Sequence, residues 1–307
     1  RGAYGQTGNM PQTKAKYTTL SSSNIGGING LVPSSTLGNP DIKPERTTEL
    51  EFGADFSVMG GLATVEATLY QQSIEDLILL VDEAPSSGAS NSWQNGGEME
   101  TNGLEFALGL NPTSLLDLGG LDWNMHMTYY TNESEVTKLT VDPYNYGGFA
   151  TFLGTYRIEE GVSPTAIVGA DYDADGNHIE LGNENPDFRL SFRNSLSFGP
   201  LSLSFLIDHK EGGHAINLAN LIYDLGATTA DYEENGSRTA VLGGGSTAPY
   251  VESTTYTALR DLSLTYLLPA GLTEGYGLSN VQLGLALRNW WMASDYTGLS
   301  PEVSQFG

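Results

Sequence analysis

Cysteine is absent from the 307-residue chain, and basic residues are scarce. Without thiols the chain has no disulfide framework, zinc ribbon, iron–sulfur site or cysteine nucleophile. Only 13 Lys and Arg stand against 37 Asp and Glu, which gives a formal net charge of −24. Proteins that bind nucleic acid through its phosphates need clustered Lys and Arg, so we expect no nucleic-acid partner.

Long apolar runs are also missing. No stretch approaches 18 consecutive apolar residues, so the sequence predicts no transmembrane helix. Residues 1–4 (RGAY) show neither an initiator Met nor the pattern of a signal segment, and we expect the chain to begin partway through a longer protein. The chain is nevertheless 39% hydrophobic and 10% aromatic, which excludes a disordered polypeptide.

The dominant sequence period is two, as in a β-strand with two different faces. Ala63, Val65 and Leu69 fall on one face of such a strand, while Thr64 and Glu66 fall on the other. The same alternation recurs along the chain. It predicts about nine strands of roughly 8–14 residues each and almost no sustained helix.

The connections between these strands alternate in length. Short turns are predicted near residues 59–61, 111–120, 199–200 and 269–280. Long loops are predicted over about 9–43, 73–97, 132–186, 210–253 and 292–307. Since successive antiparallel strands place every other connection at the same end, the long loops share one end. This asymmetry is typical of an outer-membrane β-barrel, with short periplasmic turns and long extracellular loops.

The two faces of the predicted strands differ in chemistry. One face is rich in ionisable side chains, such as Glu49, Asp55 and Arg193. The apolar face often ends in aromatic residues, namely Phe56, Trp123, Phe198 and Tyr266 at the short-turn end and Tyr70, Tyr129, Phe188, Tyr256 and Trp290 at the other. A lipid-facing band with aromatic girdles around a wet, charged lumen explains both faces. The alternative is a soluble β-sandwich, whose strands also alternate.

Six blocks of sequence resemble one family and follow that family's order. They are residues 1–9 (RGAYGQTGN), 39–49 (NPDIKPERTTE), 95–105 (NGGEMETNGLE), 185–188 (NPDF), 259–266 (LRDLSLTY) and 295–303 (DYTGLSPEV). Together they resemble the C-terminal half of the barrel of a SusC/RagA-type TonB-dependent outer-membrane transporter. The resemblance covers nearly the whole chain except the long loops.

This resemblance implies an all-β fold, an antiparallel transmembrane β-barrel of which the chain supplies about nine of an expected 22 strands. Residues 1–307 would be the C-terminal portion of a single barrel, with the plug domain and the last strand outside it. The protein would lie in the outer membrane of a Gram-negative, Bacteroidota-like cell, with its long loops extracellular. It would not be an enzyme.

The same resemblance implies a function and its partners. The transporter would import glycan or peptide fragments as nutrients, under a SusD-like surface lipoprotein that covers the extracellular mouth. TonB, with ExbB and ExbD, would act on an N-terminal region outside this sequence. Two alternatives stay open, an outer-membrane barrel with a surface-structural or adhesion and assembly role, and a soluble β-rich carbohydrate enzyme.

Residues 171–176 (DYDADG) match the start of a calcium-binding loop. Asp171, Asp173 and Asp175 place carboxylates at alternate positions, and Glu180 follows. The twelfth position of the loop holds Gly182 instead of the usual Glu, and an acidic hairpin turn is the alternative. Ca²⁺ is the one cofactor that the sequence suggests.

Aromatic residues in the predicted long loops are the candidates for substrate contact, because such rings combine a large apolar face with a polar tip. The candidates are Trp93, Tyr144, Tyr146, Tyr156, Tyr223 and Tyr250. The alternative is that these rings pack the loops on one another or on the lid. The sequence contains no nucleophile motif that would predict a catalytic residue.

Overall fold

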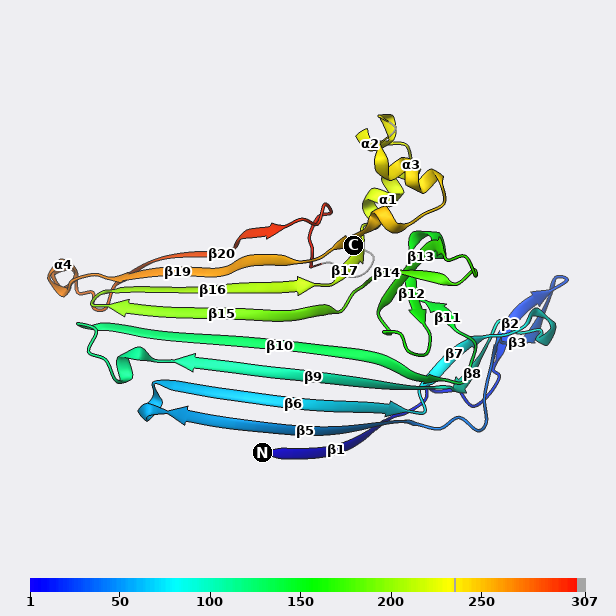
Figure 1. Ribbon diagram of the computed structural model, residues 1–307, viewed down its shortest axis with the longest axis horizontal. Helices are drawn as coiled ribbons and strands as arrows, with labels where there is room; N and C mark the ends of the chain where they lie inside the picture. Colours follow the sequence, from blue (N-terminus) through cyan, green and yellow to red (C-terminus); the bar gives the residue numbers. More distant parts are fainter. Residues whose placement is uncertain (235, 303–307) are drawn as a thin grey trace.

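The computed structural model describes residues 1–234 and 236–302. Nine strands of the described residues form one antiparallel sheet, and their order in the sheet follows their order in the chain (Figure 1). They are β1 (Gly2–Asn9), β5 (Glu45–Val58), β6 (Ala63–Glu75), β9 (Gly97–Leu110), β10 (Leu121–Leu139), β15 (Pro186–Phe198), β16 (Leu201–Gly212), β19 (Tyr256–Leu267) and β20 (Gln282–Ser294). The predicted antiparallel, up-and-down architecture is confirmed.

The sheet does not close on itself within the described residues. In this sheet β1 pairs with β5 alone, and β20 pairs with β19 alone. The strands are 12 to 19 residues long apart from β1. A tilted strand needs about 9–11 residues to cross the apolar core of a bilayer, so these strands are long enough and extend beyond it. The total of 22 strands stays a prediction.

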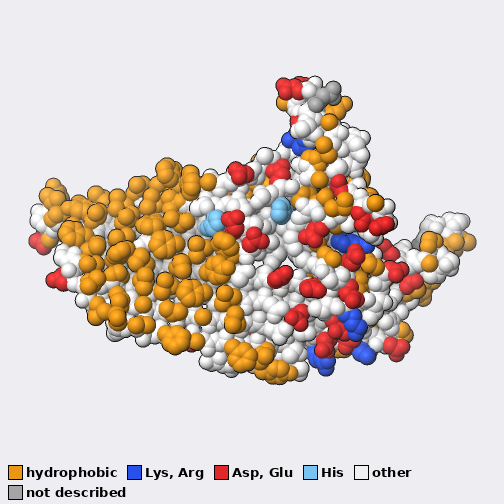
Figure 2. Space-filling model, in the orientation of Figure 1, with side chains coloured by type: hydrophobic (Ala, Val, Ile, Leu, Met, Phe, Trp, Pro, Cys, Tyr) orange, Lys and Arg blue, Asp and Glu red, His pale blue; other side chains and the backbone are white. Residues whose placement is uncertain are grey.

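One face of the sheet is apolar. Phe52 pairs with Leu69, and Leu69 pairs with Leu104, so large apolar side chains lie side by side across three strands. Phe52 is 61% exposed and Leu69 is 59% exposed. Figure 2 shows that hydrophobic side chains form a broad band over the part of the sheet nearest the short turns. Water-soluble monomers rarely expose so large an apolar patch, whereas lipid solvates it.

The opposite face of the sheet is polar. Arg1 forms an ion pair with Asp55 at 3.4 Å, and the Gln72 amide donates a hydrogen bond to the Glu49 carboxylate at 2.9 Å. The exposed ionisable groups on this face are those that the sequence assigns to the lumen of a barrel. The two-residue period therefore predicts the faces of most strands correctly.

Tyr256 departs from the predicted pattern, since its register places it on the polar face opposite Lys210. The cause is a β-bulge between Leu259 and Asp261, which shifts the alternation along β19 by one residue. Tyr266, on the far side of the bulge, keeps its predicted apolar face, where it pairs with Leu201. The prediction that Tyr256 belongs to an aromatic girdle is therefore wrong.

Tyr70 also lies on the polar face, where it pairs with Glu51 on one side and Gly103 on the other. Its ring covers Gly103, because a Cβ atom built on that glycine would come within 2.2 Å of Tyr70 Cζ. An aromatic ring over a cross-strand glycine fills the space that a side chain would otherwise occupy. The predicted girdle position of Tyr70 is therefore wrong as well.

Short connections join the strands at one end of the sheet, as the sequence predicts (Figure 1). They contain η1 (Met59–Gly61), η3 (Pro112–Ser114), residues 199–200, and the pair α4 (Ala270–Thr273) with η6 (Glu274–Tyr276). Gly199 adopts a φ of +55°, a left-handed conformation that glycine accommodates without strain. This residue lets β15 and β16 meet in a tight hairpin turn.

The long connections gather at the other end, where they fold into smaller units. We call residues 10–44, 76–96, 140–185 and 213–255 together the crown. Its strands are β2 (Leu20–Ile25), β3 (Ile28–Pro33), β4 (Thr36–Leu37), β7 (Ile78–Asp82), β8 (Asn91–Asn95), β11 (Tyr144–Tyr146), β12 (Thr155–Ile158), β13 (Ala166–Tyr172), β14 (His178–Asn183), β17 (His214–Ile216) and β18 (Val251–Ser253). Its helices are α1 (Leu218–Leu225), α2 (Ala230–Glu233) and α3 (Ser237–Gly243). No helix in the described part of the chain is long and apolar enough to span a membrane.

Several predicted loop boundaries differ from the structure. β10 runs to Leu139 and β16 to Gly212, although the sequence predicts loops from residues 132 and 210. β20 runs to Ser294, and the predicted loop over 292–307 extends past the described residues. The helices of residues 218–243 follow no helical period long enough to predict them.

The crown has a small hydrophobic core of its own. Ile167, Ile216 and Leu218 are buried in it, and Leu153, Tyr156 and Val251 pack against them. Ile167 comes from the connection between β10 and β15, whereas Ile216 comes from the connection between β16 and β19. This core is therefore built from two of the four connections of the crown, residues 140–185 and 213–255, which pack together.

Candidate functional site

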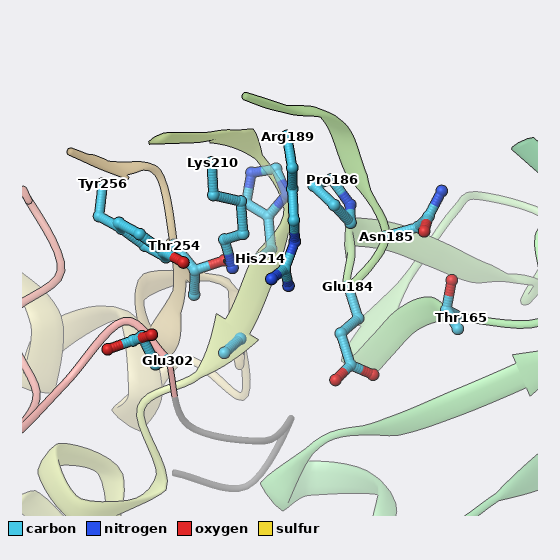
Figure 3. Close-up of a pocket in the computed structure, with 11 residues that line it drawn as sticks. Thr165, Glu184, Asn185, Pro186, Arg189, Lys210, His214, Thr254, Tyr256 and Glu302 are labelled. Atoms are coloured by element: carbon cyan, nitrogen blue, oxygen red, sulfur yellow. Dashed lines mark hydrogen bonds between the residues drawn. The ribbon is translucent and has the colours of Figure 1, made fainter. Parts of the chain in front are cut away.

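A polar pocket opens where β15, β16 and β19 meet the crown (Figure 3). Its volume is about 320 Å³. The charged and aromatic side chains that line it are Glu184, Arg189, Lys210, His214, Tyr256 and Glu302. The pocket therefore joins the polar face of the sheet to the folded long connections.

Two cations of this pocket lie opposite each other on neighbouring strands. Arg189 of β15 pairs with Lys210 of β16, and both point into the pocket in Figure 3. Lys210 is only 7% exposed, and its Nζ donates to Thr254 Oγ1 at 2.6 Å and to the Pro301 carbonyl at 3.5 Å. The Nε atom of Arg189 is buried and has no hydrogen-bond partner among the described residues.

A third cation, Arg260, is fully occupied by protein groups. Its guanidinium donates to Asp208 Oδ2 at 2.8 and 3.0 Å, to the Tyr256 hydroxyl at 3.0 Å, and to both carboxylate oxygens of Glu302. Arg260 lies in the β19 bulge, which turns its side chain toward the polar face. It therefore fixes the segment after β20 against the wall of the sheet and occupies the Glu302 carboxylate.

Two of the sequence blocks behind the family resemblance meet at Asn95. The Asn95 side chain accepts a hydrogen bond from the Lys43 backbone at 2.8 Å and donates to the Lys43 carbonyl at 3.0 Å and to the Asp76 carbonyl at 2.8 Å. Glu45 accepts hydrogen bonds from the Asn9 side chain and the Ile78 backbone. These polar residues hold the crown onto the strand ends.

The structure does not bring the four carboxylates of the calcium hypothesis together. Asp171 accepts hydrogen bonds from the Thr247 backbone and the Ser246 hydroxyl, 75 or more residues away along the chain. Asp173 accepts from Asn177 and from the Asp175 backbone, and the Asn177 side chain lowers the pKa of the Asp173 carboxyl. Throughout the described ranges, no group of three or more His, Asp or Glu side chains is placed to hold a metal.

These contacts place Asp175 and Glu180 in the turn and strand of an acidic hairpin formed by β13 and β14. Its turn is closed by the Asp173 carboxylate itself. The four acidic residues of the calcium hypothesis therefore belong to a hairpin, which is the alternative that the sequence left open. Asp171 joins this hairpin to the connection between β16 and β19.

Two of the aromatic candidates for substrate contact belong to the interior of the crown. Tyr250 is 0% exposed, and its hydroxyl donates to Asp224 Oδ2 at 2.7 Å. Tyr156 packs against the core around Ile167. A side chain without exposed surface contacts no ligand, so the hypothesis is wrong for Tyr250 in this structure.

The remaining aromatic candidates reach the surface to different degrees. Tyr146 is 64% exposed and Tyr223 is 58% exposed. Trp93 and Tyr144 are half-buried, in β8 and β11 respectively. None of these four lines the polar pocket between Arg189 and Lys210. A substrate role for them stays a prediction, away from that pocket.

The helices of the crown are held by one buried carboxylate. Asp224 accepts hydrogen bonds from Arg238 at 2.6 and 3.1 Å, from Tyr250 and from Thr229. The Arg238 guanidinium is the main reason that the pKa of Asp224 falls to about 2. Burial is the main reason that the pKa of the Tyr250 phenol is raised. This charge cluster is structural, because it joins α1, α3 and η5 (Ala248–Tyr250).

Arg189 and Lys210, which we call the cationic pair, were not predicted from the sequence as a site. The alternation of residues 188–193 puts Arg189 on the polar face, but Lys210 stands where the sequence predicts a loop to begin. The cross-strand register that sets these two residues opposite each other comes from pairing between strands, which one sequence does not display.

Comparisons with known proteins agree with the fold. The family model described as "TonB dependent receptor-like, beta-barrel" matches residues 1–289. TonB-dependent receptor P26 of Formosa agariphila is 27% identical over 100% of this chain and 36% of its own length. TonB-dependent receptor P3 of the same organism is 25% identical over 99% of this chain and 36% of its own length. The chain thus spans about a third of these relatives.

Solved structures give the same fold at lower sequence identity. The RagAB peptide importer in its "closed-closed" state matches with a TM-score of 0.72 and 22% identity, over 99% of this chain and 38% of that chain. The RagAB peptide transporter matches with a TM-score of 0.71 and 21% identity, over 99% of this chain and 37% of that chain. Together with the family match, the exposed apolar band and the polar inner face show that the chain belongs to the β-barrel family of TonB-dependent receptors, which are transporters of the outer membrane and generally not enzymes.

Proposed function

We propose that this chain forms part of the wall and the mouth of a TonB-dependent transporter that imports nutrient fragments, either glycans or peptides, across the outer membrane. In this proposal the crown faces the cell exterior, and residues 1–307 are the C-terminal portion of a single barrel. A plug and a TonB contact would come from other parts of the polypeptide, and TonB would act with ExbB and ExbD.

The observation that carries the proposal is the polar pocket between the sheet and the crown. It lies at the long-loop end of the polar face, so a solute that enters a lumen along this face passes it. The apolar band lies on the opposite face, where lipid would surround it. A wall with one wet face and one lipid face suits passage of a water-soluble ligand.

We further propose that a SusD-like surface lipoprotein closes the mouth. The lipoprotein would contact the exposed aromatic side chains of the crown, which are Tyr146 and Tyr223. Exposed Tyr is common at protein interfaces because its ring is apolar and its hydroxyl remains able to hydrogen-bond. The similarity of this chain to the RagAB structures supports this proposal.

Deletion of the complete transporter gene tests the proposal. We expect the deletion strain to lose growth on one class of oligomer, oligosaccharide or peptide, when that class is its sole nutrient source. Complementation with the full-length gene restores growth, whereas a version without its TonB contact does not. Unchanged growth on every class, together with a defect in surface assembly, would instead favour the adhesion role.

A further inference from the structure

The cationic pair of the pocket stands out against the charge of the chain. Acidic residues outnumber basic ones by 37 to 13. Within the described ranges, seven of the 13 basic residues form ion pairs with carboxylates, for example Arg46 with Glu75, Arg238 with Asp224, and Arg260 with Asp208. Arg189 and Lys210 form no ion pair within the described ranges, although they lie opposite each other. Two adjacent like charges repel each other unless an anion lies between them.

Burial makes this arrangement costly without a ligand. Lys210 is 93% covered, and within the described ranges its ammonium donates hydrogen bonds to one hydroxyl and one carbonyl, both of them neutral. The carboxylates of Glu184 and Glu302 attract it through space, but in the described part of the chain neither forms an ion pair with it. The Nε–H of Arg189 is buried and unpaired. A buried charge without a directly bonded counter-charge, and a buried donor that lacks an acceptor, both destabilise a protein. An anionic oxygen group in the pocket would remove both penalties.

The carboxylates around the pocket indicate which other chemical groups the anionic ligand carries. Glu302 lies on one side of the pair and is bound by Arg260, while Glu184 lies on the other side (Figure 3). Each carboxylate oxygen can accept more than one hydrogen bond, so these groups, Glu302 included, can still accept from hydroxyl or amide N–H groups on the same ligand. The adjoining pocket contains Glu133, Glu135 and Asp187 and, among its described lining residues, no Lys or Arg. The cationic pocket is therefore confined to one short stretch of the mouth.

We propose that Arg189 and Lys210 form a subsite that binds a carboxylate of the imported oligomer, at a unit that also carries hydroxyl or amide donors. The subsite rests on the proposed import function and names the chemistry of its ligand. Its volume of about 320 Å³ suits one unit of an oligomer rather than a whole chain. An acidic sugar unit and the terminal residue of a peptide share this chemistry.

Binding measurements on the full-length transporter in detergent test the subsite. The probes are a trimeric uronate oligosaccharide, a tripeptide with a free terminal carboxylate, and their uncharged counterparts, the methyl-esterified trimer and the amidated tripeptide. We expect one of the two acids to bind at least tenfold more tightly than its counterpart. The acid that binds identifies the source of the carboxylate. Failure of both acids to bind would overturn the proposal.

Variants then assign the preference to the pair. Lys210→Met keeps the buried stem without the charge, and Arg189→Gln keeps a polar end. Each variant should weaken binding of the acid at least tenfold and leave binding of its uncharged counterpart unchanged. Lys210→Arg should keep part of the preference for the acid. Arg193→Gln is the matched control, since Arg193 lies on the same strand and the same face outside the pocket. Equal losses for acid and counterpart, or equal losses in the control, would overturn the assignment.

Growth on the same oligomers separates this inference from the function on which it rests. A strain that takes up oligomers but whose transporter shows no carboxylate preference refutes the subsite alone. A strain whose growth does not depend on the transporter refutes the import function, even when the isolated protein binds the acid. Each variant is used only when its unheated form migrates in gels as the folded barrel does.

Discussion

Asp224 is the residue whose charge matters most to the crown, since its carboxylate is fully buried and joins Arg238, Tyr250 and Thr229. Its pKa of about 2 lies below the ordinary value for Asp of 3.8. A folded-state pKa below the unfolded one means that the stabilisation is complete above about pH 4. It is lost as the pH falls through about 2, and the shift corresponds to about 2 kcal/mol.

Replacement of this carboxyl tests its role. Asp224→Asn keeps the shape and removes the charge, which leaves the Arg238 guanidinium without its partner, and we expect it to cost the helical part of the crown about 2–3 kcal/mol. Hydrogen exchange at the backbone amides of α1 and α3 measures the change. Asp175→Asn, in an exposed turn of the crown, is the control. Equal exchange rates in both variants would contradict the role of Asp224.

Arg260 permits a second test at a single residue. Arg260→Ala removes the hydrogen bonds that join Asp208, Tyr256 and Glu302, and it leaves two carboxylates close to each other without a cation. We expect the segment after β20 to detach from the wall at a local cost of about 3 kcal/mol. Limited proteolysis of the folded transporter detects the detachment.

Arg260→Lys separates charge from geometry in the same experiment. A lysine keeps the positive charge but cannot bridge two carboxylates with a planar fork of donors. We therefore expect the segment after β20 to be partly protected from proteolysis in this variant. Full protection in Arg260→Ala would show that other contacts hold the segment after β20.

The residue scale is also where the sequence is least informative. Tyr250 and Tyr223 look alike in a predicted loop, yet one is 0% exposed and the other 58% exposed. The difference depends on Asp224 and on the α1 helix, whose positions follow from packing between distant segments. Composition and motif spacing contain no information about such packing.

At the scale of elements, successive residues of each strand face two different environments in turn. Met127 lies between Leu108 and Phe192 on the apolar face, while His126 lies opposite Arg193 on the polar face. We expect Met127→Glu to disfavour the inserted barrel by about 1–2 kcal/mol, because a carboxylate would face lipid. His126→Glu places the same group opposite an arginine, and we expect normal insertion.

The outer-membrane fraction of each full-length variant, and its migration in unheated gels, measures this difference. The two variants differ by one position in the chain and carry the same new side chain. Similar losses in both would contradict the assignment of the two faces. Similar insertion of both would show that the apolar band does not face lipid at this position.

The strands and their faces could be predicted because alternation is a local property of the chain. The exceptions have physical causes. The bulge near Arg260 changes which face Tyr256 occupies, and a bulge leaves no clear mark in an alternating sequence. Tyr70 faces the lumen because Gly103 leaves room for its ring on the neighbouring strand. Both exceptions depend on a second strand.

At the scale of the whole molecule, the family resemblance predicted the barrel architecture from six blocks, and the structure shows that four of these blocks contact one another in pairs. Asn95 binds the backbone of Lys43, so two of the blocks meet at a strand end. Arg260 binds Glu302, so two others meet at the pocket. The crown could not be predicted in the same way, because the contacts of its core join two long connections, residues 140–185 and 213–255, that have no regular period.

The chain-order arrangement of the sheet has a consequence for how the protein forms. The strands of the large sheet pair in chain order, and four of these pairs, β5–β6, β9–β10, β15–β16 and β19–β20, are hairpins that close only a short loop, so the wall can assemble from these hairpins. The crown cannot form in this way, since the contact of Asp171 with Ser246 spans 75 residues and requires both long connections to be in place. We therefore expect the crown to be the last part of this region to fold. The cationic pocket, which lies between the crown and the sheet, would then form only after the sheet has formed.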